Sequence, residues 1–266
     1  MTYQPNENTR VECPEHWLYQ TKELIFKLLP VLKALIASGR DTRDKWIAGV
    51  ARSVASGSVV LDVGAGSAPY RERFAHCRYI TQDLGRLEDS QLQGQAGYAP
   101  LDIISDIERL PLSDGYCDVV VCTEVLEHVP EPIKAIAEMS RVLKPGGLML
   151  LSAPLRSTLH QVPYHYYGGF TPFWYERFLG GLGFSSVEIE PVGGFFRGYA
   201  HANLCCALHL SPFEGPLWKR IMCFPLWFIT VFWLAFICQI ACYALDRIYF
   251  IPSETSGYHV RACKAL

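Results

Sequence analysis

The fold of this chain is decided by the stretch Val59-Val60-Leu61-Asp62-Val63-Gly64-Ala65-Gly66-Ser67-Ala68-Pro69-Tyr70. A short apolar run of β-type residues contains Asp62 near its end and passes into two glycines that are separated by one residue. Glycine lets the backbone turn sharply and approach a ligand closely, so that bare N–H groups can face a nucleotide-like molecule. The stretch therefore predicts a buried strand, a tight turn and a ligand site at the carboxyl end of the strand.

The composition indicates an apolar α/β chain and excludes some classes of partner. Of the 266 residues, 50% are hydrophobic and 19% are charged, with a net charge of −2. This length fits one α/β domain with additions, and without a basic footprint no nucleic acid is expected as a partner. The ten cysteines are scattered without a C-x-x-C pair or a zinc spacing. Together with the polar N-terminus, this predicts reduced thiols, no cleavable signal peptide and a cytoplasmic location.

Downstream of the quoted stretch, the hydrophobic pattern alternates between strands and helices. Strands are predicted at 58–63, 78–82, 101–105, 118–122, 148–152, 186–190 and 258–264. Helices are predicted at 15–37, 44–55, 69–76, 131–143 and 172–182. Strands that alternate with helices at this spacing imply an α/β fold with a parallel sheet and helices on both faces.

The glycine turn by itself does not identify the ligand, because nicotinamide-binding folds share the Gly64-x-Gly66 spacing. The third glycine of the dinucleotide fingerprint would fall at Pro69, so that motif is incomplete. Asp62 suits a ligand that carries an ammonium group and a sulfonium charge. The residues therefore favour S-adenosylmethionine as the cofactor, with a nicotinamide oxidoreductase as an open alternative.

Acidic residues follow the successive strands in the order that such a ligand needs. Asp83 lies 19 residues after the first glycine, where a carboxylate can accept both ribose hydroxyls. Asp106 offers an acceptor for the adenine amino group, and Ile107 offers an apolar contact for its face. Thr123 and Glu124 end the fourth strand, at the carboxyl edge where ligands of such sheets bind. Four acids at successive strand ends predict a shared cofactor site.

Three runs then carry a family resemblance. They are Asp106-Ile107-Glu108-Arg109-Leu110-Pro111, Cys117-Asp118-Val119-Val120-Val121-Cys122-Thr123-Glu124-Val125-Leu126-Glu127-His128-Val129-Pro130 and Arg141-Val142-Leu143-Lys144-Pro145-Gly146-Gly147. The chain resembles the class I S-adenosylmethionine-dependent methyltransferases, and within them the type 11 subgroup, over roughly residues 45–190 and the last ten. The resemblance implies a Rossmann-like, seven-stranded, mostly parallel sheet whose last strand is antiparallel and inserted near the sixth. It implies cofactor contacts at Asp62, Gly64, Gly66, Asp83, Asp106, Ile107 and Glu124, to which the end of the fourth strand adds Thr123.

The acceptor side of the site is predicted from a loop rich in His and Tyr that leaves the fifth strand at the same edge. Methyl transfer from a sulfonium is an in-line displacement, and a hydroxyl acceptor needs a positioned base. The candidate catalytic residues are His128, His160 and His165. The candidate substrate-binding residues are Tyr164, Tyr166 and Tyr167.

The Glu124–His128 run also raises a divalent-cation hypothesis, because carboxylates and imidazole are plausible ligands. The same letters occur widely where no metal is used, so no metal is assigned to the site.

Residues 221–245, IMCFPLWFITVFWLAFICQIACYAL, contain no charged side chain across 25 positions. As one helix this segment would be about 37 Å long, enough to cross a bilayer. A single crossing is disfavoured, because the chain must return to the sheet within about a dozen residues and backbone cannot lie unpaired in lipid. Two arrangements remain: a hairpin or in-plane element that dips into one leaflet, with 195–210 as its other arm, or a helix that packs against the fold or a second subunit. Membrane association through 221–245 is the favoured prediction, and a homodimer is the alternative.

These patterns combine into one functional prediction. The chain is expected to be an enzyme that transfers a methyl group to a small-molecule or lipid-linked acceptor, by in-line displacement, on the cytoplasmic side of a membrane. The alternative is a non-catalytic scaffold protein that keeps the fold and binds the cofactor. The acceptor atom stays open. The predicted segments are an N-terminal extension (1–40), a methyltransferase core (41–194), an apolar helical insertion (195–250) and the last strand (251–266).

Overall fold

The computed structural model describes residues 39–88, 91–92, 97–209 and 216–266. Within them the chain falls into two compact units, one made of Gly39–Val192 with Gly257–Leu266 and the other of Gly193–Ser256. The helix predicted at 15–37 lies outside the described residues. Each unit is considered by itself below.

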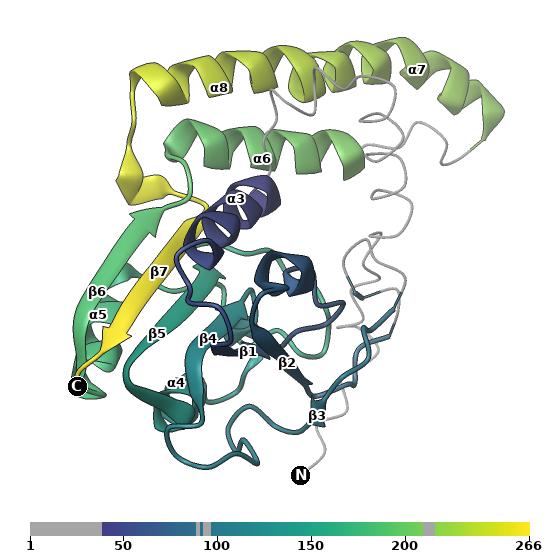
Figure 1. The fold of residues 1–266 in the computed structure, drawn as a ribbon. Coiled ribbons are helices and arrows are strands. Elements are labelled where there is room, and N and C mark those ends of the chain that lie inside the picture. The colour runs from purple at the N-terminus through teal and green to yellow at the C-terminus, as the bar shows by residue number, and fades with distance from the viewer. Residues whose placement is uncertain (1–38, 89–90, 93–96, 210–215) are drawn as a thin grey trace. The chain divides into compact units, whose positions relative to one another are not determined.

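The first unit is built on one seven-stranded sheet with the order β3-β2-β1-β4-β5-β7-β6 (Figure 1). Its strands are β1 (Val59–Val63), β2 (Arg78–Asp83), β3 (Ile103–Ile104), β4 (Cys117–Thr123), β5 (Leu143–Pro154), β6 (Phe184–Pro191) and β7 (Gly257–Lys264). Strands β1 to β5 pair in parallel, whereas β7 is antiparallel to both of its neighbours, β5 and β6. The predicted fold class is confirmed, including the antiparallel last strand beside the sixth.

Apolar side chains cover both faces of this sheet. Helices α4 (Pro132–Val142) and α5 (Pro172–Gly181) pack in one cluster with Leu61 of β1. Helix α3 (Gly39–Ala51) and the short 3-10 helix η2 (Arg71–Phe74) pack in the other cluster with Val60 of the same strand. Burial on both faces explains why β1 reads as a continuous apolar run rather than an alternating one.

Two local predictions differ from the structure. The helix predicted at 69–76 is a single 3-10 turn at Arg71–Phe74, because the chain has only a few residues in which to pass from the glycine turn to β2. The helix predicted at 131–143 ends at Val142, because Leu143 already has extended torsions at φ −82° and ψ 132° and begins β5.

The second unit is helical. It comprises α6 (Phe195–His209), α7 (Leu217–Phe232), a π-helical turn η4 (Trp233–Ile237), α8 (Cys238–Ile248) and η5 (Pro252–Glu254). The path from α7 to α8 is continuous, since Trp233 and Cys238 keep helical torsions. Helix α8 packs on α6: the Gln239 amide donates to the Ala200 carbonyl at 2.6 Å, and the buried Asp246 carboxylate accepts the Gly194 N–H at 3.1 Å at the start of α6. Asp246 thus places a negative charge where the α6 dipole is positive.

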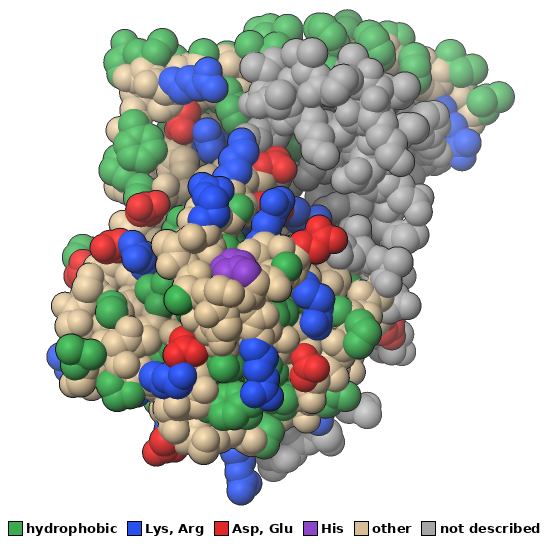
Figure 2. Space-filling view, in the orientation of Figure 1, with side chains coloured by type: hydrophobic (Ala, Val, Ile, Leu, Met, Phe, Trp, Pro, Cys, Tyr) green, Lys and Arg blue, Asp and Glu red, His purple; other side chains and the backbone are tan. Residues whose placement is uncertain are grey.

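Helix α7 has no buried residue. We call its exposed large hydrophobic side chains the α7 apolar surface: Leu217, Trp218, Ile221, Met222, Phe224, Leu226, Phe228, Ile229 and Phe232. Figure 2 shows hydrophobic side chains gathered along α7 and α8. Among the described helices, none combines the length and the apolar character that crossing a bilayer requires.

Candidate functional site

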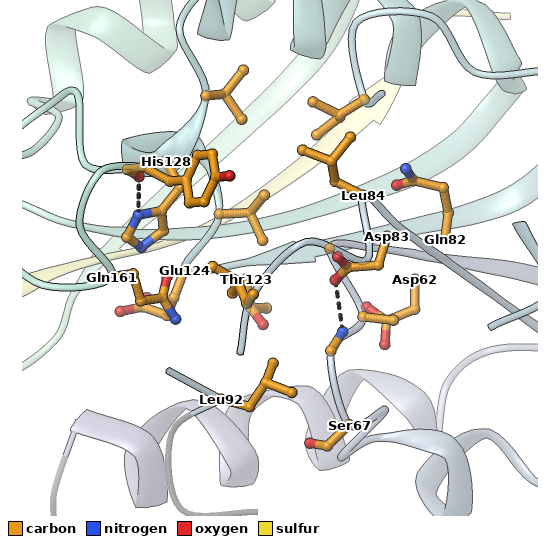
Figure 3. Close-up of a pocket in the computed structure, with 18 of the residues that line it drawn as sticks. Asp62, Ser67, Gln82, Asp83, Leu84, Leu92, Thr123, Glu124, His128 and Gln161 are labelled. Atoms are coloured by element: carbon orange, nitrogen blue, oxygen red, sulfur yellow. Dashed lines mark hydrogen bonds between the residues drawn. The ribbon is translucent and has the colours of Figure 1, made fainter. Parts of the chain in front are cut away.

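A pocket of about 360 Å³ opens at the carboxyl ends of β1, β2 and β4 in the first unit (Figure 3). All eight residues predicted to contact the cofactor line this pocket: Asp62, Gly64, Gly66, Asp83, Asp106, Ile107, Thr123 and Glu124. The volume lies within the range of small-molecule and cofactor sites. Parallel pairing brings these strand ends together although the residues span more than sixty positions of sequence.

The glycine turn after β1 forms the floor of the pocket and admits no side chain at its first position. Gly64 has φ +70° and Gly66 has φ +52°, which is the left-handed region that glycine adopts without penalty. A Cβ atom on Gly64 would lie 2.3 Å from Cγ2 of Val125. The backbone can therefore pass this close to the chain after β4 only if residue 64 is glycine.

Asp83 ties the end of β2 to this turn. One carboxylate oxygen of Asp83 accepts the Gly66 N–H at 2.9 Å (Figure 3), and the other accepts the Gly85 N–H at 3.0 Å. Each oxygen keeps a second lone pair. The same carboxylate can therefore hold the turn and accept hydroxyl groups from a ligand.

Asp62 is buried at the end of β1 and accepts a hydrogen bond from the Tyr79 hydroxyl. Loss of solvent raises the pKa of this carboxyl to about 7, against the opposing effect of the Tyr79 hydrogen bond. Burial and the charge of Asp62 raise the pKa of Tyr79 in turn, so the phenol stays a donor. The pocket therefore contains a carboxyl group that gains its full charge only when a cation or a high pH favours it.

Glu124 sits at the end of β4 in a left-handed conformation, with φ +55°, which is uncommon for a residue other than glycine and concentrates at functional sites. Its Oε1 atom accepts the Ser152 hydroxyl at 2.7 Å and forms an ion pair with Arg43 at 3.2 Å. Nε of Arg43 also donates to the Tyr70 hydroxyl at 3.0 Å. Burial lowers the pKa of Arg43, but the charge of Glu124 and the interaction with Tyr70 raise it by more, so the net shift of the pKa is upward.

Arg43 and Tyr70 are pocket residues that the sequence analysis missed. Arg43 lies on α3, before the first strand, and only the packing of α3 beside η2 brings its guanidinium to the strand ends. No local pattern in the sequence marks an arginine that a helix will carry to this edge. Tyr70 stands in the quoted glycine stretch, but it reads there as an ordinary aromatic core residue.

Asp106 and Ile107, which are predicted to hold the adenine, follow β3 and both line the pocket. One Asp106 oxygen accepts the Glu108 N–H at 3.0 Å, which leaves the other oxygen for a ligand. Apolar side chains of Leu84 and Leu92 lie at the same pocket (Figure 3). This part of the site combines one acceptor with apolar walls, as a purine would need.

The predicted acceptor-side residues divide into two groups. His128, Tyr164 and Tyr166 line the pocket. The other three are not among the lining residues: His160 and His165 pack edge-on against the His128 ring, and the Tyr167 hydroxyl donates to the Pro130 carbonyl at 2.9 Å. Their roles stay predictions.

Two loops are tied together beside the pocket. The Gln91 amide donates to the Val162 carbonyl at 3.0 Å, and the Gln161 amide donates to the Gln91 carbonyl at 3.0 Å. Gln161 lines the pocket (Figure 3) and was not predicted. These reciprocal amide bonds join the segment after β2 to the His- and Tyr-rich segment after β5.

Known proteins resemble the chain over the same region. Residues 61–151 match the model of the family described as "Methyltransferase domain". The "Ubiquinone biosynthesis O-methyltransferase" of Marinobacter nauticus is 36% identical over 105 residues, covering 36% of this chain and 44% of the relative. A "Probable S-adenosylmethionine-dependent methyltransferase" of Mycolicibacterium smegmatis is 34% identical over 158 residues, covering 56% of this chain and 59% of the relative. The matches thus span about half the length of these curated relatives.

Solved structures share the fold at low identity. A SAM-dependent methyltransferase from Archaeoglobus fulgidus superposes with a TM-score of 0.52 at 17% identity, covering 88% of this chain and 98% of that one. The [4+2]-cyclase SpnF superposes with a TM-score of 0.51 at 17% identity, covering 93% and 96%. Likeness at this level shows the fold alone.

The sheet order, the glycine turn and the acids at its strand ends define a class I methyltransferase fold. Residues 61–151 match the methyltransferase domain family, and over this region the chain is similar to S-adenosylmethionine-dependent methyltransferases of the type 11 subgroup.

The raised pKa of Asp62 predicts a pH-dependent affinity for this cationic cofactor. The cofactor favours the ionised carboxylate, so binding should strengthen as pH rises through about 7. If the ionised form alone binds, affinity increases about tenfold between pH 6 and pH 8. The raised pKa has the opposite effect on the stability of the cofactor-free protein. Between about pH 4 and 7 the Asp62 carboxyl is ionised in the unfolded chain but protonated in the folded one, so the free energy of unfolding should fall as pH rises. Calorimetric titrations with the cofactor across this pH range check the prediction. If the affinity of Asp62→Asn depended on pH as steeply as that of the wild type, another group would be responsible for the dependence.

Proposed function

We propose that this chain is an enzyme that transfers a methyl group from S-adenosylmethionine to an oxygen atom of a small-molecule or lipid-linked acceptor. The observation that carries the proposal is the gathering of all eight cofactor residues around one pocket. The reaction is an in-line displacement in which the acceptor oxygen bonds to the methyl carbon as the carbon–sulfur bond breaks. The cofactor supplies the reactive carbon, and the protein aligns the acceptor and excludes water.

The chain's own residues divide this work. Asp83 accepts the ribose hydroxyls, Asp106 and Ile107 hold the adenine, and Asp62 faces the positive charge of the methionine part. These assignments are supported by the hydrogen bonds of Asp83 and the burial of Asp62 at the pocket. Binding thus costs little reorganisation, because backbone N–H groups already fix the position of the Asp83 carboxylate.

The acceptor lies on the side of His128, Tyr164 and Tyr166, which line the same pocket. We define His128, His160 and His165 as the imidazole cluster, and we assign to it the base that takes the hydroxyl proton of the acceptor as the methyl group is transferred. An oxygen acceptor is supported by the names of two relatives as O-methyltransferases, from Marinobacter nauticus and Xanthomonas oryzae. Both names refer to ubiquinone biosynthesis, and a lipid-linked phenol has the acidic hydroxyl that such a site can use.

Membrane association through the second unit completes the proposal. The α7 apolar surface exposes nine large hydrophobic side chains, and exposed apolar surfaces of this kind mark sites that meet a membrane or another protein. Lys219 and Arg220 are the charged residues of α7, and Trp218 precedes them. A basic end with an interfacial tryptophan suits a helix that lies in the plane of an anionic membrane surface. The alternative occupant is the same surface of a second copy, which would make a homodimer.

The proposed transfer predicts that label from methyl-labelled cofactor appears in the lipid fraction of a cell extract. Purified protein is incubated with lipid and polar metabolite fractions, and products are read by mass for an added methyl group on oxygen. Asp83→Ala serves as the control without cofactor affinity. If neither fraction were labelled while calorimetry showed that the protein binds the cofactor, the enzyme proposal would be wrong and the scaffold alternative would remain. In the same preparation, wild-type protein should float with anionic vesicles, and recovery as a detergent-free soluble dimer would contradict the membrane part.

A further inference from the structure

We propose that His128, His160 and His165 form a binding site for a divalent transition-metal ion of the Zn²⁺ type. The imidazole cluster offers one ring nitrogen from each residue, and these three atoms lie within 4.8 Å of one another. Three imidazoles with a free fourth position are a ligand set that zinc uses in catalytic sites. The inference concerns ion binding and stands whether or not the proposed methyl transfer is correct.

The spacing of the rings is close to what coordination requires. The rings are mutually edge-on, with centroid separations of 4.7, 5.6 and 4.7 Å. Two nitrogens bound to one tetrahedral ion lie about 3.3 Å apart, so the widest pair needs to close by roughly 1.5 Å. His160 and His165 lie between β5 and α5, outside any helix or strand, where such a shift breaks no regular backbone pairing.

Two rings are oriented by neighbouring backbone. Nδ1 of His128 lies 2.6 Å from the Tyr164 carbonyl oxygen, so this nitrogen must donate, and Nε2 keeps a lone pair. Nδ1 of His160 is 2.9 Å from the Thr158 carbonyl oxygen. Ligand histidines in metalloproteins characteristically use one ring nitrogen for such a hydrogen bond and the other for the ion.

A buried carboxylate beside the cluster supplies an independent observation. Glu127 is 1% exposed, and its Oε1 lies 3.8 Å from Nε2 of His128. Within the described residues, its Oε2 has no hydrogen-bond partner. Burying a carboxyl group with an unpartnered oxygen is costly, and a cation held by the imidazole cluster would offset that cost.

The structure also changes the cation hypothesis drawn from the sequence. That hypothesis places Glu124 among the ligands, but its Oε1 is held by Arg43 and Ser152, and Glu124 is not part of the cluster. The imidazoles of the loop after β5 take its place. Because His128 also lines the cofactor pocket, an ion here would leave a coordination position for water or for an acceptor oxygen.

Co²⁺ is the probe that tests the site, because it occupies imidazole sites of the zinc type and absorbs visible light. The full-length protein is stripped with a chelator and titrated with Co²⁺ while its absorption spectrum is recorded. We expect one equivalent to bind with a tetrahedral spectrum and without the sulfur-to-cobalt band that a thiolate ligand would give. His160→Ala and His165→Ala should each weaken binding by roughly 100-fold or more.

The matched control is His76→Ala, because His76 bonds the Val54 carbonyl at 3.1 Å and lies outside the cluster. Its Co²⁺ affinity should equal that of the wild type. Circular dichroism and cofactor calorimetry on each variant show whether the fold survives. Absence of stoichiometric binding, a thiolate band, or equal affinity in all variants overturns the site. Failure of cofactor binding with intact Co²⁺ binding would instead count against the proposed function.

Discussion

Replacing Gly64 by alanine should abolish cofactor binding and lower the free energy of unfolding by several kcal/mol. The new Cβ meets Cγ2 of Val125 at 2.3 Å, a distance that real Cβ contacts essentially never show. Residue 64 also has φ +70°, where a side chain costs roughly 1–2 kcal/mol, and overpacking adds about 1–3 kcal/mol. The turn must therefore move, and with it the Gly66 N–H that holds the Asp83 carboxylate at the pocket. Chemical denaturation and calorimetry measure the two effects.

Gly57→Ala is the matched control, since Gly57 has φ +81° but open space around its Cβ position. It should cost only the backbone strain, roughly 1–2 kcal/mol, and leave cofactor affinity unchanged. The double variant Gly64→Ala with Val125→Ala removes the two shortest contacts, at 2.3 and 2.9 Å, and should recover part of the stability. Equal losses of unfolding free energy in the Gly57 and Gly64 variants would show that backbone strain alone makes glycine necessary at position 64. Contact with the chain after β4 would then play no part.

Asp83→Asn should reduce cofactor affinity by about 100-fold or more. The two carboxylate oxygens accept the N–H groups of Gly66 and Gly85. In either orientation an amide would turn its NH₂ group toward one of these donors, so one bond becomes a repulsion and the charge is lost. Charge-assisted hydrogen bonds of this kind contribute about 1.5–3 kcal/mol each. Calorimetry on the purified variant gives the affinity directly.

The control for this variant is Asp102→Asn. Asp102 also accepts a backbone N–H, from Thr81 at 2.9 Å, and the Thr81 hydroxyl at 2.9 Å, but it is not among the residues that line the pocket. We expect a loss of about 1–2 kcal/mol in stability and an unchanged cofactor affinity. If both variants lowered cofactor affinity by the same factor, Asp83 would act through general destabilisation of the fold, and the proposed direct contact between Asp83 and the cofactor would be wrong.

The cofactor side of the site was predictable because it follows strand ends. Hydrophobic runs mark the strands, and acids such as Asp62, Asp83 and Asp106 stand immediately after or within them. In a parallel sheet all carboxyl ends meet at one edge, so sequence order alone brings these residues together. The same logic places the glycine turn, since its backbone conformation is a local property of Gly64 and Gly66.

The acceptor side was predicted only as a set of residue types. Six His and Tyr residues were named, and the structure separates those that line the pocket from those that pack behind His128. The segment that carries most of them is irregular, so no periodicity tells which side chain points inward. The edge-on packing of the three imidazoles depends on how this segment folds back onto η3 (Leu126–His128).

By itself, then, the sequence determined the sheet, the glycine turn and the acids beside it, because each depends on local conformation and on a topology that parallel pairing dictates. Tertiary structure alone decided the ion pair of Arg43 with Glu124, the imidazole cluster and the absence of buried residues on α7. These features depend on how elements distant in sequence pack together. Side-chain packing between such elements leaves no periodic trace in the chain.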